Sequence, residues 1–146
     1  MEDILTTAQA DNVRLSDDGT AVIILDQTQL PNRTVFLTLR TPEDLFDAIR
    51  TLKVRGAPAI GICAGYALYV AAQQLTASSF DAFLTQLATQ ADYLNQSRPT
   101  AVNLSWALKR MLRTARESES IAQALTRMRT ECHRIQQEDI DMCRRI

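Results

Sequence analysis

The N-terminal part of the chain carries its apolar residues in short runs that turn residues separate. Two runs, 21–25 (AVIIL) and 34–39 (TVFLTL), are rich in β-branched side chains, as strands usually are. The segments 17–19 (DDG) and 30–32 (LPN) fit the two turns that connected strands need. Residues 13–39 therefore predict a three-stranded antiparallel meander.

From Thr41 onward the apolar spacing changes to the three-and-four pattern of helices. Thr41 is a candidate N-cap, and Pro42 followed by two acidic residues suits a first helical turn. The apolar positions that follow predict a helix to about Lys53. A second helix is predicted from Pro58 to about Leu75, built from Ala and Gly as much as from larger apolar residues.

The same criteria predict three further helices. Ser78 or Ser79 caps the first of them, and Pro99 opens the next. The last begins near Glu119, and its apolar residues recur at spacings of four, three, four and three, at Ile121, Leu125, Met128, Cys132 and Ile135. This pattern reaches the last residue without a Gly, Asn or Pro stop, which predicts a truncated chain.

These elements predict an α+β protein in two parts. A small N-terminal antiparallel β meander occupies residues 1–40, and a bundle of about five α-helices occupies residues 41–146. Together they form one domain, since 146 residues with 46% hydrophobic positions are enough for a single core.

The charge balance argues against a nucleic-acid partner. The formal net charge is -1, although residues 98–146 carry ten basic side chains against six acidic ones. Acidic residues alternate with the arginines of this segment, which is typical of solvated helix faces rather than of a basic binding patch.

Cysteine usage and the N-terminus predict a cytoplasmic protein without a membrane anchor. The three cysteines, Cys63, Cys132 and Cys143, form no spaced pair of the metal or redox type. The N-terminus has no basic and apolar leader pattern. The segment 57–74, which lies inside the longest uncharged run, is rich in Ala and Gly and marginal in length for a bilayer span, so it predicts a buried helix.

The most informative segment for chemistry is 55–61 (RGAPAIG). Gly56 permits backbone angles that other residues avoid, and Pro58 suits a first helical turn. The free N–H groups of that turn then lie near Arg55, and a cation beside the positive end of a helix is unfavourable on its own. An anion between them removes this conflict, so the segment predicts a phosphate or carboxylate site.

A second segment, 97–104 (SRPTAVNL), repeats the arrangement of an arginine before a proline that opens a helix. Two such segments in one domain predict a shared phosphorylated small molecule near Arg55 and Arg98. The alternative is that both are surface arginines beside ordinary helix starts.

The remaining candidates have structural interpretations. Gly61 and Gly65 give the second helix a smooth face for close packing against another helix. His133 follows Cys132, but neighbours on a helix point about 100° apart, so the pair is not expected to be catalytic. Trp106 is expected in the core or in an interface. The sequence shows no zinc pattern, nucleophile elbow or common phosphate-binding glycine loop.

Four segments in this order resemble methylthioribose-1-phosphate isomerases. They are 25–31 (LDQTQLP), 48–61 (AIRTLKVRGAPAIG), 98–108 (RPTAVNLSWAL) and 138–140 (EDI). The resemblance covers nearly the whole chain. It implies an aldose-ketose isomerase of methionine salvage that converts 5-methylthioribose 1-phosphate to 5-methylthioribulose 1-phosphate with no metal or organic cofactor.

The resemblance also implies which residues hold the phosphorylated methylthio-sugar. Arg55, Gly56, Ala57 and Arg98 match the family's substrate-contacting positions. The family's proposed catalytic cysteine and aspartate belong to a C-terminal Rossmann-like domain that this chain does not contain, so no residue here is expected to be catalytic. The chain is therefore expected to be inactive alone. The full-length family implies a homodimer, and the isolated chain is expected to self-associate.

Two related families remain as alternatives. The regulatory subunits of the translation initiation exchange factor share the architecture and would make this chain an assembly module. The complete RGAPAIG segment at 55–61 argues against them. Ribose-1,5-bisphosphate isomerases share a block like that at 98–102 and remain an enzyme alternative.

Overall fold

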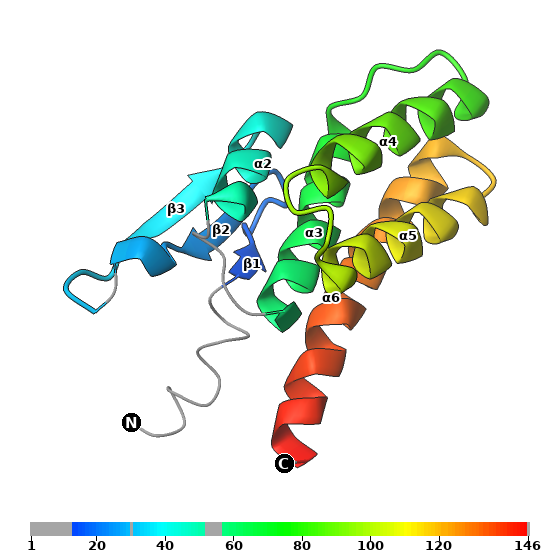
Figure 1. The fold of residues 1–146 in the computed structure, drawn as a ribbon. Helices are drawn as coiled ribbons and strands as arrows, with labels where there is room; N and C mark the ends of the chain where they lie inside the picture. Colours follow the sequence, from blue (N-terminus) through cyan, green and yellow to red (C-terminus); the bar gives the residue numbers. More distant parts are fainter. Residues whose placement is uncertain (1–12, 30, 52–56, 146) are drawn as a thin grey trace.

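The structure, a computed structural model, describes residues 13–29, 31–51 and 57–145. A three-stranded sheet precedes five helices (Figure 1), which confirms the predicted α+β class. The strands are β1 (Val13–Leu15), β2 (Val22–Leu25) and β3 (Phe36–Leu39), with the short 3-10 helix η1 (Gln27–Gln29) before β3. The helices are α2 (Pro42–Arg50), α3 (Ala57–Gln73), α4 (Phe80–Asn95), α5 (Val102–Arg116) and α6 (Ile121–Arg145).

The sheet is the predicted antiparallel meander, in the order β1-β2-β3. Its first turn is closed by the Asp18 carboxylate, which accepts hydrogen bonds from the Ser16 hydroxyl at 2.7 Å and from the Thr20 hydroxyl at 2.7 Å. These bonds favour the ionised form and lower the pKa of Asp18 to about 2. Gly19 follows with φ 77°, a left-handed conformation that glycine adopts without strain. The second predicted turn includes Leu30, which lies outside the described residues.

Helix α3 is the centre of the core. Every residue from 59 to 72 is buried, and the helix carries no charged residue over its length. It packs against α5 and α6 and against β1 and β2, while α4 and α2 cover the rest of it (Figure 1). A helix that is apolar all round must be enclosed on every side, and the other elements are arranged to do so.

Two predicted helix starts are confirmed, because they depend on local capping. The Thr41 hydroxyl accepts from the Asp44 amide at 3.1 Å before α2, and the Ser79 hydroxyl accepts from the Ala82 amide at 3.1 Å before α4. The C-terminal end of α2 was predicted too late, since the helix ends at Arg50 rather than near Lys53.

The predicted start of the fourth helix at Pro99 is wrong. Helix α5 begins at Val102, after an N-cap residue, Ala101, that makes no side-chain cap. The Ala101 amide donates to the Arg98 carbonyl at 2.9 Å, so residues 98–101 form a turn with Pro99 in its second position. Proline suits this position of a turn as well as it suits a first helical turn, and the chain must reverse here between α4 and α5.

Trp106 was expected in the core or in an interface, and its exposure excludes the core. It lies on α5 with 49% of its surface exposed, so it is not a core residue. Its neighbour Val102, one turn earlier on the same helix, is 78% exposed. The spacing of apolar residues on α5 does not distinguish the side that faces α3 from the side that faces solvent.

The glycines of α3 provide the predicted close packing. A Cβ atom at Gly65 would lie 3.2 Å from the Ile135 Cδ1 atom and 3.6 Å from the Cys132 Cβ atom, both on α6. At Gly61 it would lie 3.4 Å from the Asn103 carbonyl oxygen of α5. The two glycines therefore set the approach of α3 to two different helices.

We expect Gly65→Leu to lower the free energy of unfolding by about 2 kcal/mol or more, because the larger side chain overlaps α6. Gly65→Ala should have a much smaller effect, since the Ile135 methyl group can move by a few tenths of an ångström. The control is Ala122→Leu at an exposed position of α6. Thermal unfolding followed by circular dichroism measures the three variants, and equal Tm values for Gly65→Leu and the wild type would contradict the packing.

Two cysteines of the core are chemically protected. Cys63 on α3 and Cys132 on α6 are both buried without a disulfide. Burial disfavours the thiolate and raises the pKa of each thiol to about 12. At pH 8 both groups are therefore protonated in the folded protein.

In a Cys143→Ser background only Cys63 and Cys132 remain, and we expect neither to react with Ellman's reagent over an hour at pH 8. The thiolate is the nucleophile, so a raised pKa and burial both slow the reaction. The same sample unfolded in guanidinium chloride should react promptly at both thiols, as its own control. Rapid labelling of the folded protein would show that the core opens easily at α3 and α6.

Candidate functional site

A cavity of about 390 Å³ opens where the first turns of α3 and α5 meet the second half of α6. Pro58 and Gly61 of α3 lie on one side of it, and Val102 and Asn103 of α5 lie on another. The close approach of Gly61 to the Asn103 carbonyl oxygen brings these two helix starts together. Free N–H groups at adjoining helix starts favour an anionic ligand, as the sequence predicted for this region.

The structure describes only part of the predicted substrate site. Arg55 and Gly56 lie outside the described residues, and Ala57 is the first residue of α3. Arg98 is partly buried in the turn that precedes α5 and is not among the residues that line the cavity. The structure thus brings the two helix starts together, and the roles of Arg55, Gly56, Ala57 and Arg98 remain predictions.

The cavity walls contain residues that the sequence did not mark as a site. Ile62 and Ile135, both buried, form an apolar part, and Trp106 adds an aromatic ring. Glu138 and Asp139 of α6 bring two carboxylates to the same cavity. An aromatic ring and carboxylates are groups that bind the C–H faces and hydroxyls of sugars. No spacing in the sequence indicates that the three helices converge here.

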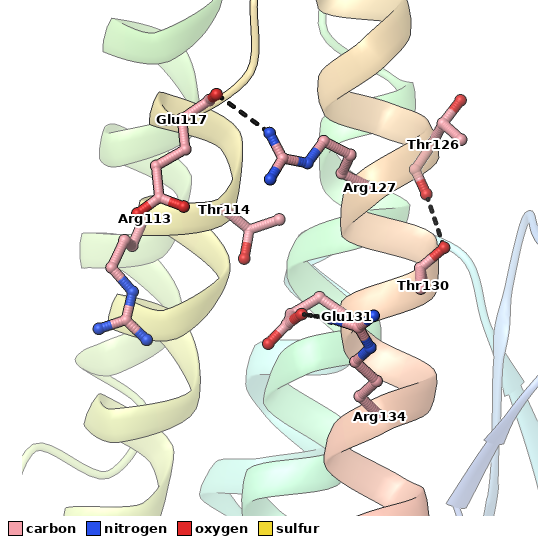
Figure 2. A pocket seen from close by; sticks show the side chains of 8 residues that line it. All are labelled: Arg113, Thr114, Glu117, Thr126, Arg127, Thr130, Glu131 and Arg134. Atoms are coloured by element: carbon pink, nitrogen blue, oxygen red, sulfur yellow. Dashed lines mark hydrogen bonds and ion pairs between the residues drawn. The ribbon is translucent and has the colours of Figure 1, made fainter.

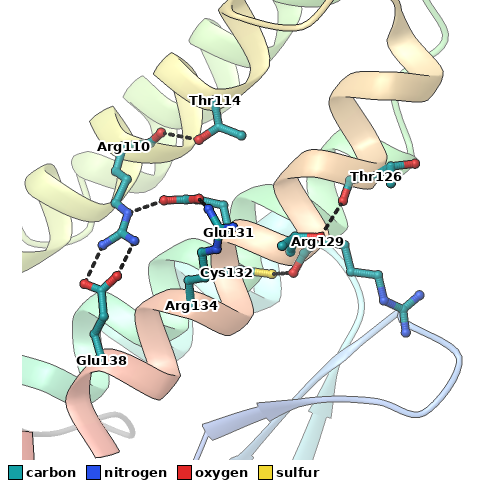
Figure 3. Close-up of polar contacts among 9 residues, drawn as sticks. Arg110, Thr114, Thr126, Arg129, Glu131, Cys132, Arg134 and Glu138 are labelled. Carbon is teal, nitrogen blue, oxygen red and sulfur yellow. Dashed lines mark hydrogen bonds and ion pairs between the residues drawn. The ribbon is translucent and has the colours of Figure 1, made fainter. Parts of the chain in front are cut away.

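Arg110 of α5 connects the walls to one another (Figure 3). Its guanidinium donates from Nε to Glu131 Oε2 at 2.5 Å, from Nη1 to Glu138 Oε1 at 2.8 Å and from Nη2 to Glu138 Oε2 at 2.5 Å. The guanidinium carbon also lies 5.3 Å from the centre of the Trp106 ring. The Arg110 side chain is 12% exposed, and the bidentate contact with Glu138 is of the strong, charge-assisted kind.

The pKa values of the two carboxyl groups of the cavity shift in opposite directions. The Arg110 hydrogen bonds lower the pKa of Glu138, so its carboxylate stays ionised at neutral pH. Burial raises the pKa of the neighbouring Asp139, because the charged form loses solvation. The Glu138 bonds raise the pKa of Arg110 in turn, and the Glu131 bond adds to this against the effect of burial.

His133 has a structural environment. Tyr66 of α3 is buried, and its hydroxyl lies 3.1 Å from His133 Nδ1 and donates to Gln136 Oε1 at 2.5 Å. Gln136 in turn donates to the Val13 carbonyl of β1 at 2.8 Å. Burial lowers the pKa of His133, so the ring is held mostly neutral. These contacts join α3, α6 and β1, in line with the expectation that Cys132 and His133 are no catalytic pair.

A second groove, of about 340 Å³, lies between α5 and α6, away from the starts of α3 and α5, and contains three arginines (Figure 2). Two of them already bind groups of the groove: Arg127 donates to the Glu117 carbonyl at 3.0 Å, and Arg134 donates to Glu131 at 3.4 Å. The Thr130 hydroxyl donates to the Thr126 carbonyl within α6. The groove also contains the carboxyl groups of Glu117 and Glu131, which offset part of its positive charge, so it is a weaker anion site than its arginines alone indicate.

Two further properties concern the described parts of the chain only. None of the helices that the structure describes combines the length and apolarity needed to cross a bilayer. Among residues 13–29, 31–51 and 57–145, no three histidine, cysteine or acidic side chains come together in a way that could hold a metal ion.

Known proteins resemble this chain in sequence. A methylthioribose-1-phosphate isomerase from Bacillus licheniformis is 52% identical over 129 residues, which are 88% of this chain and 36% of the relative. A 5-deoxyribose 1-phosphate isomerase from Clostridium botulinum (strain Loch Maree / Type A3) is 43% identical over 136 residues, 92% of this chain and 39% of that protein. The chain thus spans little more than a third of the length of these curated relatives.

Solved structures resemble it in fold. The delta subunit of translation initiation factor eIF-2B from A. fulgidus superposes with a TM-score of 0.82 at 32% identity, over 88% of this chain and 37% of that one. The 5-methylthioribose 1-phosphate isomerase from Pyrococcus horikoshii OT3 superposes with a TM-score of 0.79 at 30% identity, over 85% and 35%. Residues 53–146 match the Initiation factor 2 subunit family, so the match includes α3 to α6 and the whole cavity. This chain is therefore a member of the Initiation factor 2 subunit family.

Proposed function

We propose that this chain is the substrate-anchoring part of a sugar-phosphate isomerase that converts 5-methylthioribose 1-phosphate to 5-methylthioribulose 1-phosphate in methionine salvage. The observation that carries the proposal is the meeting of two helix starts at one cavity with an aromatic and a carboxylate wall. The names of the relatives from Bacillus licheniformis and Pyrococcus horikoshii OT3 support the choice of substrate. A cytoplasmic location fits this role.

In this proposal the phosphate and the sugar bind to different groups. Arg55, Gly56, Ala57 and Arg98 hold the phosphate near the first turns of α3 and α5, where backbone N–H groups add to the guanidinium charges. The sugar lies in the cavity, where Trp106 faces its C–H groups and Asn103, Glu138 and Asp139 face its hydroxyls. Separate anchoring of the two ends fixes the orientation of the substrate.

Anchoring alone does not isomerise an aldose. The reaction moves a hydrogen between neighbouring sugar carbons, and this step needs groups that exchange a proton or guide a hydride at those carbons. The described cavity offers two carboxyl groups, Glu138, which Arg110 already binds on both oxygens, and Asp139, and neither belongs to the cysteine and aspartate pair that the family resemblance implies. We therefore propose that the catalytic groups are not supplied by this chain.

An assembly module is the second candidate function. The observations that favour it are the superposition on the eIF-2B delta subunit and the exposure of Val102 and Trp106 on α5. An exposed apolar pair beside a cavity is typical of a protein contact as well as of a ligand site. In either function we expect copies of the isolated chain to associate through this surface.

The first test is binding of methylthioribose 1-phosphate, followed as a rise in Tm. A ligand at about 100 times its Kd stabilises a protein by about 2.7 kcal/mol. We expect Arg98→Gln to reduce this stabilisation strongly, because one phosphate anchor is lost. Arg113→Gln, at an exposed arginine of α5 that does not line the cavity, is the control of equal charge. Equal reductions in both variants would contradict a site at Arg98, and no rise in Tm for the wild type would favour the assembly module.

The second test is turnover. We expect the purified chain to produce no 5-methylthioribulose 1-phosphate above the rate of the buffer, even at saturating substrate, because in this proposal the groups that move the hydrogen are not supplied by this chain. The product is measured by coupled assay or by proton NMR, with the same chain heated and centrifuged as the blank. Turnover that follows protein concentration and disappears in the blank would contradict this part of the proposal.

A further inference from the structure

Arg110 does not line the cavity, yet it contacts two residues that do. Trp106 precedes it by one turn on α5, and Glu138 faces it from α6. Its third partner, Glu131, lies about two turns before Glu138 on α6 and binds the Nε atom of the same guanidinium (Figure 3). One largely buried side chain thus touches the aromatic wall and a carboxylate wall of the site at once.

We infer that Arg110 is a positioning residue of the cavity: it fixes Trp106 and Glu138 in the orientation in which they contact the sugar of the bound ligand. The inference rests on the proposed function for the identity of the ligand. Arg110 acts through its two neighbours, so it is neither a binding residue nor a catalytic one.

Arg110 has to hold these two side chains because each is about half-exposed and could otherwise adopt other rotamers. The Glu138 side chain is 56% exposed, and an exposed glutamate otherwise samples several rotamers. The guanidinium binds both of its carboxylate oxygens and leaves it one orientation. Trp106 is half-exposed, and the cation over its ring opposes rotation of the ring away from Arg110.

Charge gives a second reason for Arg110 at this place. Glu138 and Asp139 bring negative charge to a cavity that the proposal assigns to a phosphorylated sugar, and like charges repel. Arg110 compensates Glu138 directly through two charge-assisted bonds. The carboxylate can then accept hydrogen bonds from sugar hydroxyls while it repels the phosphate less strongly.

A bridge that only ties α5 to α6 would not require these contacts. The bond to Glu131, whose side chain is 15% exposed, already joins the two helices. The additional contacts go to the two cavity residues within reach of the guanidinium. A positioning role predicts effects on Trp106 and on sugar binding that a loss of helix packing would not produce.

The experiment compares Arg110→Gln with Arg134→Gln. Arg134 shares the partner Glu131 at 3.4 Å, but its side chain is 67% exposed, and its charge lowers the pKa of Glu138 less than the Arg110 contacts do, so it is a matched control. Trp106 is the only tryptophan of the chain, and its fluorescence therefore reports this wall alone. We expect acrylamide to quench Trp106 more efficiently in Arg110→Gln and unchanged in Arg134→Gln.

Binding gives the second readout on the same proteins. We expect Arg110→Gln to lower the affinity for methylthioribose 1-phosphate about tenfold, as the loss of one well-oriented contact does. The affinity for inorganic phosphate should fall by less than about twofold. Arg134→Gln should change neither affinity. Equal weakening of both ligands, or unchanged quenching of Trp106 in Arg110→Gln, would overturn the inference.

The experiment distinguishes a failure of ligand binding from a failure of the variant to fold. If the wild type binds no sugar phosphate, the proposed function fails, and the quenching comparison alone then supports or overturns the role of Arg110. If Arg110→Gln does not fold, Arg110→Lys replaces it, because a single ammonium cannot bind Glu131 and both oxygens of Glu138 together. The expected change in Arg110→Lys has the same direction, and its absence in the folded variant overturns the inference.

Discussion

The burial of α3 is the constraint on which the rest of this fold depends. An isolated helix with apolar residues on all sides is unstable in water, and it becomes favourable only when other elements remove its whole surface from solvent. Residues 59–72 are all buried, and no other helix of the described chain approaches this. The sheet, α2 and α4 cover what α5 and α6 leave open. Small residues such as Gly61 and Gly65 allow the neighbours to come close enough to exclude water.

The same enclosure creates the cavity. The close contact at Gly61 fixes the start of α5 beside the start of α3, and that at Gly65 fixes α6 across both. Helix α6 has 25 residues and α5 has 15, so α6 extends past the start of α5 in Figure 1 and carries Glu138 and Asp139 to the open end. The site is thus a consequence of core packing at one end of α3 and needs no separate scaffold.

The sequence predicted local features well and distant ones poorly, for a physical reason. The caps at Thr41 and Ser79 were predictable because each bonds an amide three residues away. Pro99 was not, since its ring fits a turn and a helix start equally and only the reversal between α4 and α5 decides. Arg110 and Glu138 are 28 residues apart on two helices, and no periodicity in either helix shows that they meet. The predicted substrate residues Arg55, Gly56, Ala57 and Arg98 came from the two helix-start segments and from the family resemblance, and of these four the structure describes Ala57 and Arg98.

A shared fold leaves the choice between isomerase part and assembly module to the side chains of this one cavity. Both kinds of protein superpose on the chain almost equally well, so the helices themselves do not discriminate. A protein contact would be served by Val102 and Trp106 alone, because an apolar surface requires no ionised group beside it. Glu138 and Asp139 make such a surface less favourable, since a partner would have to desolvate two carboxyl groups. A sugar phosphate gains from the same groups, provided that Arg110 compensates the charge of Glu138. A purely apolar contact would have to desolvate Arg110 and its carboxylates. This desolvation cost is therefore an argument for a small polar ligand.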